Sequence, residues 1–151
     1  MVSIRVLGLF ALIGGALAIT GVCCNWYMFV GSGIAFTGLE ITRMPDLSFH
    51  FCPTVIGIMG VIMIFFGLLE LTGISTKTIK SLNGTFMIIF GLATIIIPAL
   101  FYCVNFLYGY DFSIILESIK IEEGMILCFI GGFLELMAGL LAVFSTDKNS
   151  S

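Results

Sequence analysis

The sequence predicts an all-α membrane protein: a bundle of four transmembrane helices with a small extracytoplasmic β-hairpin and a short interfacial helix. Two observations lead to this fold class. The chain of 151 residues is 60% apolar and only 10% charged, with a mean hydropathy of +1.21, and a soluble domain of this size needs far more charged surface. It also contains four apolar runs, each long enough to cross the roughly 30 Å hydrocarbon core of a bilayer as a helix.

These runs divide a single domain, residues 1–151, into membrane segments and connections. We expect helices at about 6–24, 53–74, 85–103 and 124–144, outer segments at 25–52 and 104–123, and an inner loop at 75–84. The first run could instead be a secretory signal peptide, because Ala16-Leu17-Ala18 is typical of a cleavage site. The run continues to Cys24, beyond the usual apolar region of a signal peptide, so we expect an uncleaved helix.

Basic residues beside the runs predict the orientation, because they favour the cytoplasmic side. Those on the side of the two termini are Arg5, Lys77, Lys80 and Lys148. Those on the opposite side are Arg43 and Lys120. This distribution predicts a multi-pass protein of the cytoplasmic (plasma) membrane with both termini in the cytoplasm.

The first outer segment is predicted to form the β-hairpin. The stretches 27–30 and 34–42 are rich in β-branched and aromatic residues, and Gly31-Ser32-Gly33 between them is typical of a turn. Aromatic residues also gather at this side of the membrane. We expect an aromatic belt at the outer lipid interface that includes Trp26, Tyr27 and Tyr102.

The second outer segment is predicted to contain a short amphipathic helix that begins at Asp111. Phe112, Ile115, Leu116 and Ile119 have the spacing of one helix face. Such a helix would lie on the outer membrane surface with this face in the lipid. The alternative is an ordinary polar connector.

Glycines recur at seven-residue intervals in all four runs. The pairs are Gly8/Gly15, Gly14/Gly21, Gly60/Gly67, Gly84/Gly91, Gly124/Gly131 and Gly132/Gly139. Seven residues return a helix to nearly the same face, and small residues allow membrane helices to approach closely. The glycines therefore predict the faces through which the four helices pack.

The phrase Gly-x-Leu-Glu-Leu occurs twice, at residues 67–71 and 132–136, and places Glu70 and Glu135 in apolar sequence. Charge there costs about 2.5–3.5 kcal/mol on insertion scales. Two interpretations stay open. The carboxyl groups join helices by hydrogen bonds, with Thr94 or a backbone carbonyl as partner, or they form a proton or cation site. The repeated phrase also suggests duplication of a helix–loop–helix unit.

The five cysteines lie near the predicted outer surface. They are Cys23, Cys24, Cys52, Cys103 and Cys128. This grouping allows one or two disulfides, with Cys24 or Cys23 bonded to Cys52, or a cluster of reduced thiols.

The sequence contains no pattern typical of a metal, cofactor or catalytic site. His50 is the only histidine and no CxxC motif is present, so we predict no metal site and no cofactor. A nucleophile with a base, a phosphate-binding glycine loop and an HExxH motif are all missing, so we predict no catalytic residues and no enzymatic activity. Without a basic stripe, nucleic acid is not an expected partner.

Three short motifs surround the first outer segment: Cys23-Cys24-Asn25-Trp26, Thr37-Gly38-Leu39-Glu40 and Pro45. Their order resembles the small four-helix membrane proteins of archaea and bacteria. The layout is also loosely similar to the claudin superfamily, which implies four spans, cytoplasmic termini and a β-rich first outer segment. Claudins continue the Gly-Leu motif with tryptophan and have two cysteines downstream. Here Glu40 follows Leu39 and only Cys52 lies downstream within the same outer segment, so the resemblance does not imply a barrier or adhesion function.

These features favour a non-enzymatic structural, accessory or assembly subunit. We expect it to lie in the lipid bilayer and to bind other membrane proteins or itself through helix packing and its outer cap. The alternative is a small transporter or ion-conducting subunit that uses Glu135 and Glu70.

Overall fold

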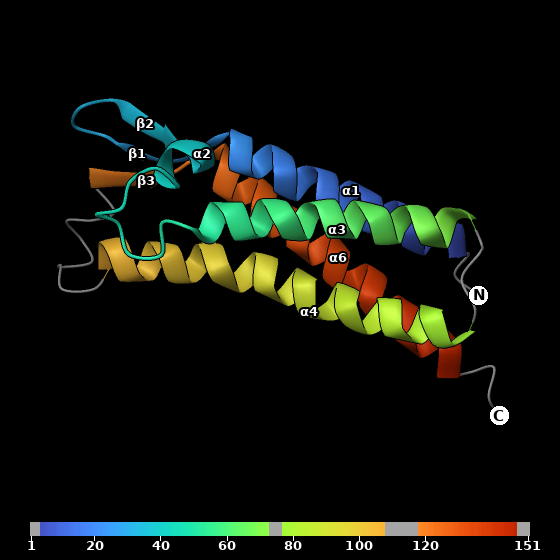
Figure 1. The fold of residues 1–151 in the computed structure, drawn as a ribbon. Helices are drawn as coiled ribbons and strands as arrows, with labels where there is room; N and C mark the ends of the chain where they lie inside the picture. The colour runs from blue at the N-terminus through green and yellow to red at the C-terminus, as the bar shows by residue number, and fades with distance from the viewer. Residues whose placement is uncertain (1–3, 73–76, 108–117, 148–151) are drawn as a thin grey trace.

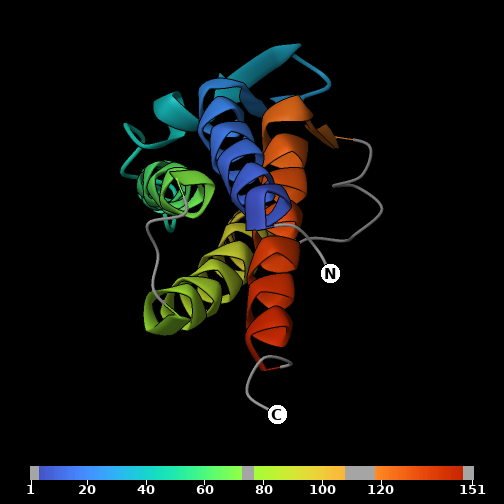
Figure 2. The same ribbon diagram turned by 90° about the vertical axis from the view of Figure 1, so that its right-hand side faces the viewer.

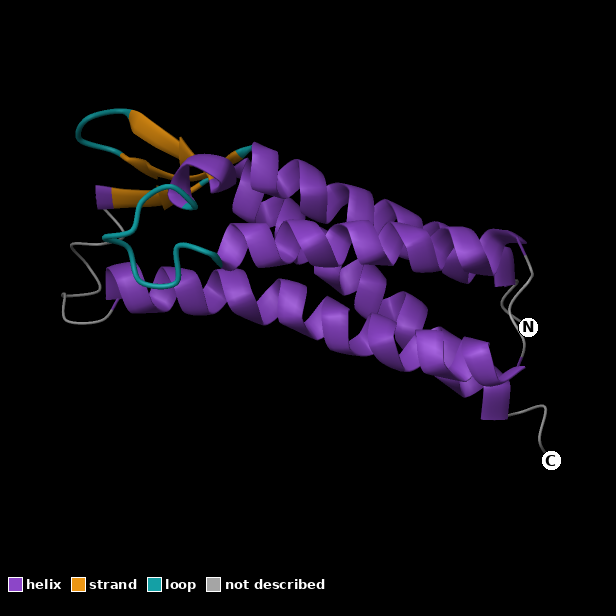
Figure 3. Ribbon diagram, viewed as in Figure 1, coloured by secondary structure: helices purple, strands orange, loops and turns teal. Residues whose placement is uncertain are grey.

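The computed structural model describes residues 4–72, 77–107 and 118–147, in which four long helices form a bundle with a small sheet at one end (Figure 1, Figure 3). The helices are α1 (Ile4–Cys23), α3 (Cys52–Thr72), α4 (Lys77–Tyr102) and α6 (Glu123–Asp147). Each is long and apolar enough to cross a membrane. Ile4 and Asp147 lie at the end of the bundle opposite the sheet. This confirms the predicted four-helix bundle, and its composition is consistent with a multi-pass membrane protein.

Two helices extend further into polar sequence than predicted. α4 begins at Lys77, so most of the predicted inner loop is helical, and α6 continues to Asp147. In the first turns of α4, the apolar positions Ile79, Leu82 and Phe86 keep the i, i+3, i+7 spacing of a helix. The predicted helix ends were wrong because they were placed at the ends of the apolar runs. A helix can continue into polar sequence as long as its apolar residues keep the helical spacing.

The end of α4 nearer the sheet is irregular. The helix continues through Pro98 and passes into a π-helix, η1 (Cys103–Leu107). Proline removes one backbone donor and crowds the preceding turn, and η1 begins five residues after Pro98. Asn105 in η1 donates its side-chain amide to the carbonyl oxygen of Phe101 over 2.9 Å, which gives this carbonyl a partner.

Glycine pairs fix three of the helix–helix interfaces. In Figure 2, α3 lies beside α1 and α4 lies beside α6, and α1 also packs along α6. The facing pairs are Gly8–Gly67 and Gly15–Gly60 for α1–α3, Gly14–Gly131 and Gly21–Gly124 for α1–α6, and Gly84–Gly139 and Gly91–Gly132 for α4–α6. Every predicted glycine row is therefore a helix contact, and each interface is fixed at two points seven residues apart.

The contact between α3 and α4 is different, because large side chains fill it. Met63 and Met87 are fully buried, and the ring of Phe66 stacks on that of Phe90 at a centroid distance of 6.5 Å. Without facing glycines the two backbones cannot approach as closely. The bundle therefore consists of three close interfaces and one filled by methionine and phenylalanine.

The sheet has three antiparallel strands in the order β2–β1–β3: β1 (Asn25–Phe29), β2 (Ile34–Thr37) and β3 (Ile119–Ile121). The predicted hairpin is confirmed, with its turn at 31–33. The third strand was not predicted. Ile119 and Lys120, assigned to the amphipathic helix, belong to β3, and residues 111–117 of that predicted helix lie outside the described residues.

The second strand ends at Thr37, five residues earlier than predicted, because a helical turn, α2 (Gly38–Ile41), begins there. Its N-terminus is a capping box. Thr37 donates its backbone N–H to Oε2 of Glu40 over 2.8 Å, and the Glu40 N–H donates to Oγ1 of Thr37 over 3.2 Å. The hydrogen bond from the Thr37 backbone, followed by that from its hydroxyl, holds the pKa of Glu40 below its usual value.

This capping box predicts a pH dependence of the cap, which consists of the three-stranded sheet and α2 at this end of the bundle. A carboxyl whose pKa is lower in the folded state stabilises that state above its unfolded pKa and loses this contribution as the pH falls through the folded value. We therefore expect the amide resonance of Thr37 to shift on acidification with a midpoint below 4.5, the ordinary value for glutamate. In Glu40→Gln, whose amide oxygen still accepts the hydrogen bond, this titration should disappear. A midpoint at or above the ordinary value contradicts the capping box.

A β-bulge turns Trp26 into the bundle. Asn25 pairs with Thr37 and Tyr27 with Phe36, so Trp26 is the extra residue of β1. A bulge breaks the alternation of a strand and redirects a side chain, and both Trp26 and Tyr27 are buried, at 0% and 2% exposure. Trp26 donates its indole N–H to the Gly21 carbonyl oxygen over 3.0 Å and meets the Phe101 ring edge-on at 5.6 Å. Trp26 thus joins the cap to α1 and α4.

Candidate functional site

Glu135 lies at the centre of the bundle. It is the thirteenth of the 25 residues of α6 and is fully buried. Thr94 on α4, also fully buried, donates its hydroxyl to Oε2 of Glu135 over 3.2 Å. The other carboxyl oxygen, Oε1, has no hydrogen-bond partner among the described residues. The predicted pairing with Thr94 is confirmed, and it joins α4 to α6.

The backbone of α1 closes the other side of this carboxyl. A Cβ atom added to Gly14 would lie 2.8 Å from Cγ of Glu135 and 2.8 Å from the carbonyl oxygen of Gly131. Glycine at position 14 therefore makes room for the Glu135 side chain. Chemically, the arrangement offers one satisfied carboxyl oxygen and one free acceptor that can take a proton or a cation.

Glu70 has a different environment, near the end of α3 at which the termini lie. It is the third residue from the end of α3 and is 3% exposed. The buried side chain of Asn83 on α4 donates its amide to Oε1 of Glu70 over 3.1 Å. Asn83 was not predicted as a site residue because it fell in the predicted inner loop. The signal that could have identified it is a buriable amide at the same membrane depth as Glu70.

The two copies of the repeated phrase do not occupy equivalent positions. Gly67 of the first copy faces Gly8, and of the two glycine contacts between α1 and α3 this one is nearer the termini. Gly132 of the second copy faces Gly91, and of the two glycine contacts between α4 and α6 this one is nearer the cap. Glu70 and Glu135 therefore lie at different depths. They share one property, which is that each carboxyl accepts a hydrogen bond from α4.

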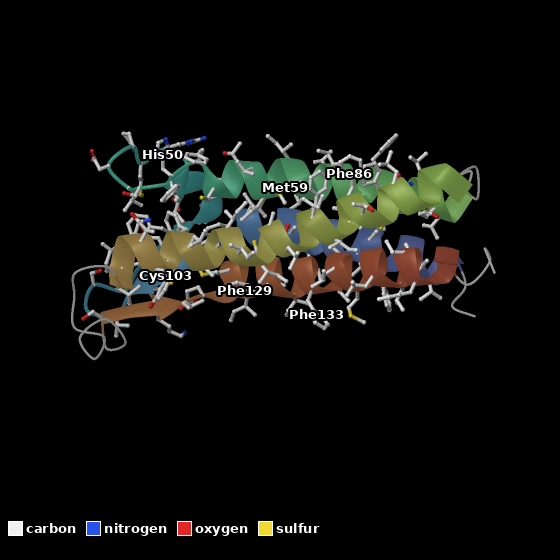
Figure 4. All side chains as sticks on the ribbon, turned by 90° about the horizontal axis from the view of Figure 1, so that it is seen from below. His50, Met59, Phe86, Cys103, Phe129 and Phe133 are labelled. Carbon is white, nitrogen blue, oxygen red and sulfur yellow. The ribbon has the colours of Figure 1, made fainter. Side chains whose placement is uncertain are left out.

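All five cysteines are free thiols. Cys23 is exposed at the end of α1, whereas Cys52 is buried in the core around Trp26, and the favoured disulfide between Cys24 or Cys23 and Cys52 is not formed. Cys103 is exposed on η1 (Figure 4). Cys128 is buried against α1, with its Sγ atom 3.8 Å from the Ala18 carbonyl oxygen. The predicted gathering of cysteines at the cap end is confirmed, but as separate thiols.

The predicted aromatic belt is wrong for Trp26 and Tyr27. Both lie at the sheet end of the bundle but are buried among protein side chains rather than exposed at the surface. Burial raises the pKa of the Tyr27 hydroxyl. Tyr102, the third belt residue that the structure describes, stays partly exposed. Trp26 and Tyr27 therefore pack between the cap and the bundle, because the bulge in β1 directs Trp26 inward.

The cap and the bundle expose different apolar surfaces. On the cap, Val30 and Ile34 beside the hairpin turn and Leu39 on α2 are each about half exposed, at 50%, 53% and 52%, and β2 is an edge strand. On the bundle, the outward residues are long apolar side chains such as Phe133, which points away from α6 in Figure 4. The polar side chains Glu70, Asn83, Thr94 and Glu135 face inward. This inside-out pattern suits helices surrounded by lipid.

Among the described residues, no three His, Cys, Asp or Glu side chains are grouped as metal ligands would be. Comparison of the chain with protein-family models, with curated proteins and with solved structures finds no match. The buried carboxyl groups of the bundle and the exposed surface of the cap are therefore the two features of the molecule that indicate a function.

Proposed function

We propose that this protein is a non-enzymatic, multi-pass subunit of the cytoplasmic membrane that acts in structure or assembly. Its termini lie in the cytoplasm, as the four-to-two distribution of basic residues favours. The cap then lies outside the cell, where it contacts another membrane protein or a second copy of the chain.

The observation that carries this proposal is the internal use of the glycine rows. The twelve glycines of the six rows all face another helix of the same chain, so these faces hold the bundle together and are closed to partners. The cap, in contrast, leaves an edge strand and the apolar side chains of Val30 and Ile34 uncovered. An edge strand is a template for pairing with another chain, and exposed apolar patches commonly mark interaction sites.

Photo-crosslinking in native membranes tests this proposal. The photoreactive residue p-benzoylphenylalanine replaces Ile34 on the cap or, as a control, Phe133 on the outward face of α6. We expect a discrete protein adduct from position 34 and only lipid adducts from position 133. Adducts from position 133 alone, or no protein adduct from either position, would overturn the proposal.

A specific observation favours a second function, proton or cation movement through the bundle. Oε1 of Glu135, half-way along α6, is a buried acceptor that has no hydrogen-bond partner in the part of the chain that the structure describes. Buried intramembrane carboxyls are often part of ion pathways. Under this alternative, Glu135 binds the ion in the centre of the bundle and Glu70 accepts it nearer the cytoplasmic end.

The variant Glu135→Gln separates the two functions. Glutamine has nearly the same shape and can keep the hydrogen bond to Thr94, so we expect the fold and the thermal midpoint in detergent to change little. If the protein is a structural subunit, wild-type and variant proteoliposomes should both show no proton or cation flux above empty vesicles. Flux in the wild type that Glu135→Gln abolishes would establish the transport function instead.

A further inference from the structure

Residues 49–51, the last three of the loop between α2 and α3, expose two aromatic rings at the cap end of the bundle. Phe49 is 47% exposed and Phe51 is 51% exposed. Their ring centroids are 6.0 Å apart in an edge-to-face arrangement. His50 lies between them, in the loop at the cap end in Figure 4. The first residue of α3, Cys52, follows directly.

The backbone of this segment is held in a strained conformation. Phe49 has φ = 58°, in the left-handed region that residues other than glycine rarely adopt. Hydrogen bonds on both sides impose it. The side chain of Asn105 on η1 accepts from the Ser48 N–H over 2.9 Å and donates to the Ser48 carbonyl oxygen over 2.8 Å, and the Cys52 N–H donates to the carbonyl oxygen of Phe49 over 2.9 Å. Strain that the fold maintains in this way commonly serves a function.

Phe51 continues the exposed row of α3. Phe51, Ile58 and Phe65 follow each other at seven-residue intervals and are 51%, 57% and 57% exposed. α3 has 21 residues, so at 1.5 Å per residue it is about 31 Å long, close to the roughly 30 Å hydrocarbon core of a bilayer. A helix of this length that crosses the core begins at its outer boundary. Phe49 and Phe51 then lie at the level of the lipid headgroups.

We propose that residues 49–51 form an outer-leaflet anchor, in which the rings of Phe49 and Phe51 insert at the boundary between lipid headgroups and acyl chains. The partner is the phospholipid surface itself. A second copy of the chain is disfavoured, because a stable protein interface buries about 800 Å² on each partner, far more than two half-exposed rings provide. The anchor fixes the depth of α3 and, through Asn105, that of the end of α4. It depends on the membrane-spanning arrangement but not on partner binding by the cap.

Depth-dependent fluorescence quenching tests the anchor. Phe49→Trp and Phe51→Trp are made separately in the full chain and reconstituted in phosphatidylcholine vesicles, where the native Trp26 is buried and gives a constant background. We expect the added indole to be quenched roughly twofold more by lipids brominated near the headgroup than by lipids brominated near the chain end. Quenching by aqueous acrylamide should be weak. Strong quenching by acrylamide without quenching by bromolipids, or no quenching by any of these, would overturn the proposal.

Two control positions calibrate the depth scale. Ser32→Trp, in the exposed hairpin turn, should be quenched by acrylamide and not by bromolipids, whereas Phe133→Trp, near the middle of α6, should respond most to bromines near the chain end. A further variant keeps the test valid if tryptophan at position 49 disturbs folding. Asparagine tolerates a positive φ, so Phe49→Asn should fold while losing one ring. In this background, Phe51→Trp should become more accessible to acrylamide, and unchanged accessibility would show that the two rings do not insert together.

Discussion

Gly91→Ala is expected to lower the free energy of unfolding by about 3 kcal/mol, the upper part of the range for overpacked cores. The added Cβ would lie 2.5 Å from the backbone nitrogen of Leu136, 2.7 Å from the carbonyl oxygen of Gly132 and 2.9 Å from Cα of Leu136. All three atoms belong to the backbone of α6, so no side chain can move aside and α4 must separate from α6. Equilibrium unfolding in mixed micelles, followed by far-ultraviolet circular dichroism, measures this loss.

Gly57→Ala is the matched control, with the same substitution on a membrane-length helix. A Cβ atom added at Gly57 on α3 meets nothing within 4 Å. Since glycine is about 1 kcal/mol less favourable than alanine in a helix interior, this variant should be slightly more stable than the wild type. Equal effects of the two substitutions would contradict close glycine packing between α4 and α6.

Trp26→Ala is expected to cost about 4 kcal/mol, as replacement of a fully buried large aromatic residue by alanine does. It removes the ring that packs on Phe101 and the donor to the Gly21 carbonyl oxygen. The cap should separate from the bundle while the helices keep most of their structure. Trp26→Phe retains a ring and should cost about 1–2 kcal/mol, the value of one lost hydrogen bond and a smaller contact.

Hydrogen exchange of the β1 and β3 amides measures this loosening of the cap, and the unfolding transition measures the overall loss. Leu39→Ala is the control, because Leu39 is 52% exposed on the cap surface and such changes usually stay within about 0.5 kcal/mol. If Trp26→Ala left the exchange of β1 unchanged, Trp26 could not be the residue that joins cap and bundle.

The bundle could be predicted from the sequence because its determinants are local patterns. An apolar run of membrane length requires only neighbouring residues to identify, and the seven-residue glycine spacing identifies one helix face. Gly15, Gly60, Gly91 and Gly132 accordingly lie in the contacts that the spacing predicted. Thr94 could be proposed as a partner of a glutamate because few polar groups occur in the apolar runs.

The structure of the cap and the hydrogen-bond partners of the polar side chains could not be predicted, because they depend on contacts between residues that are distant in the sequence. β3 has three residues, too few to show an alternating pattern. The inward direction of Trp26 follows from a bulge in the register between β1 and β2, which strand composition does not reveal. Asn83 can donate to Glu70 only because α4 lies against α3. Asn105 can bond to Ser48 only because η1 lies against the loop before α3. The possible disulfide was inferred from shared depth alone, whereas Cys52 is buried in the core around Trp26 and Cys23 is exposed, and both are free thiols.

Co-purification from native membranes, with Ile34→Asp and Glu135→Gln compared side by side, tests the central claim that the outer cap is the working surface of a closed bundle. Both variants should fold, because Ile34 is 53% exposed and Glu135→Gln preserves shape. We predict that the partner protein captured with the wild type is lost with Ile34→Asp and retained with Glu135→Gln, while neither variant changes ion flux. Retention of the partner by Ile34→Asp, together with loss of a wild-type ion flux in Glu135→Gln, would contradict the claim and assign the function to the carboxyl group inside the bundle.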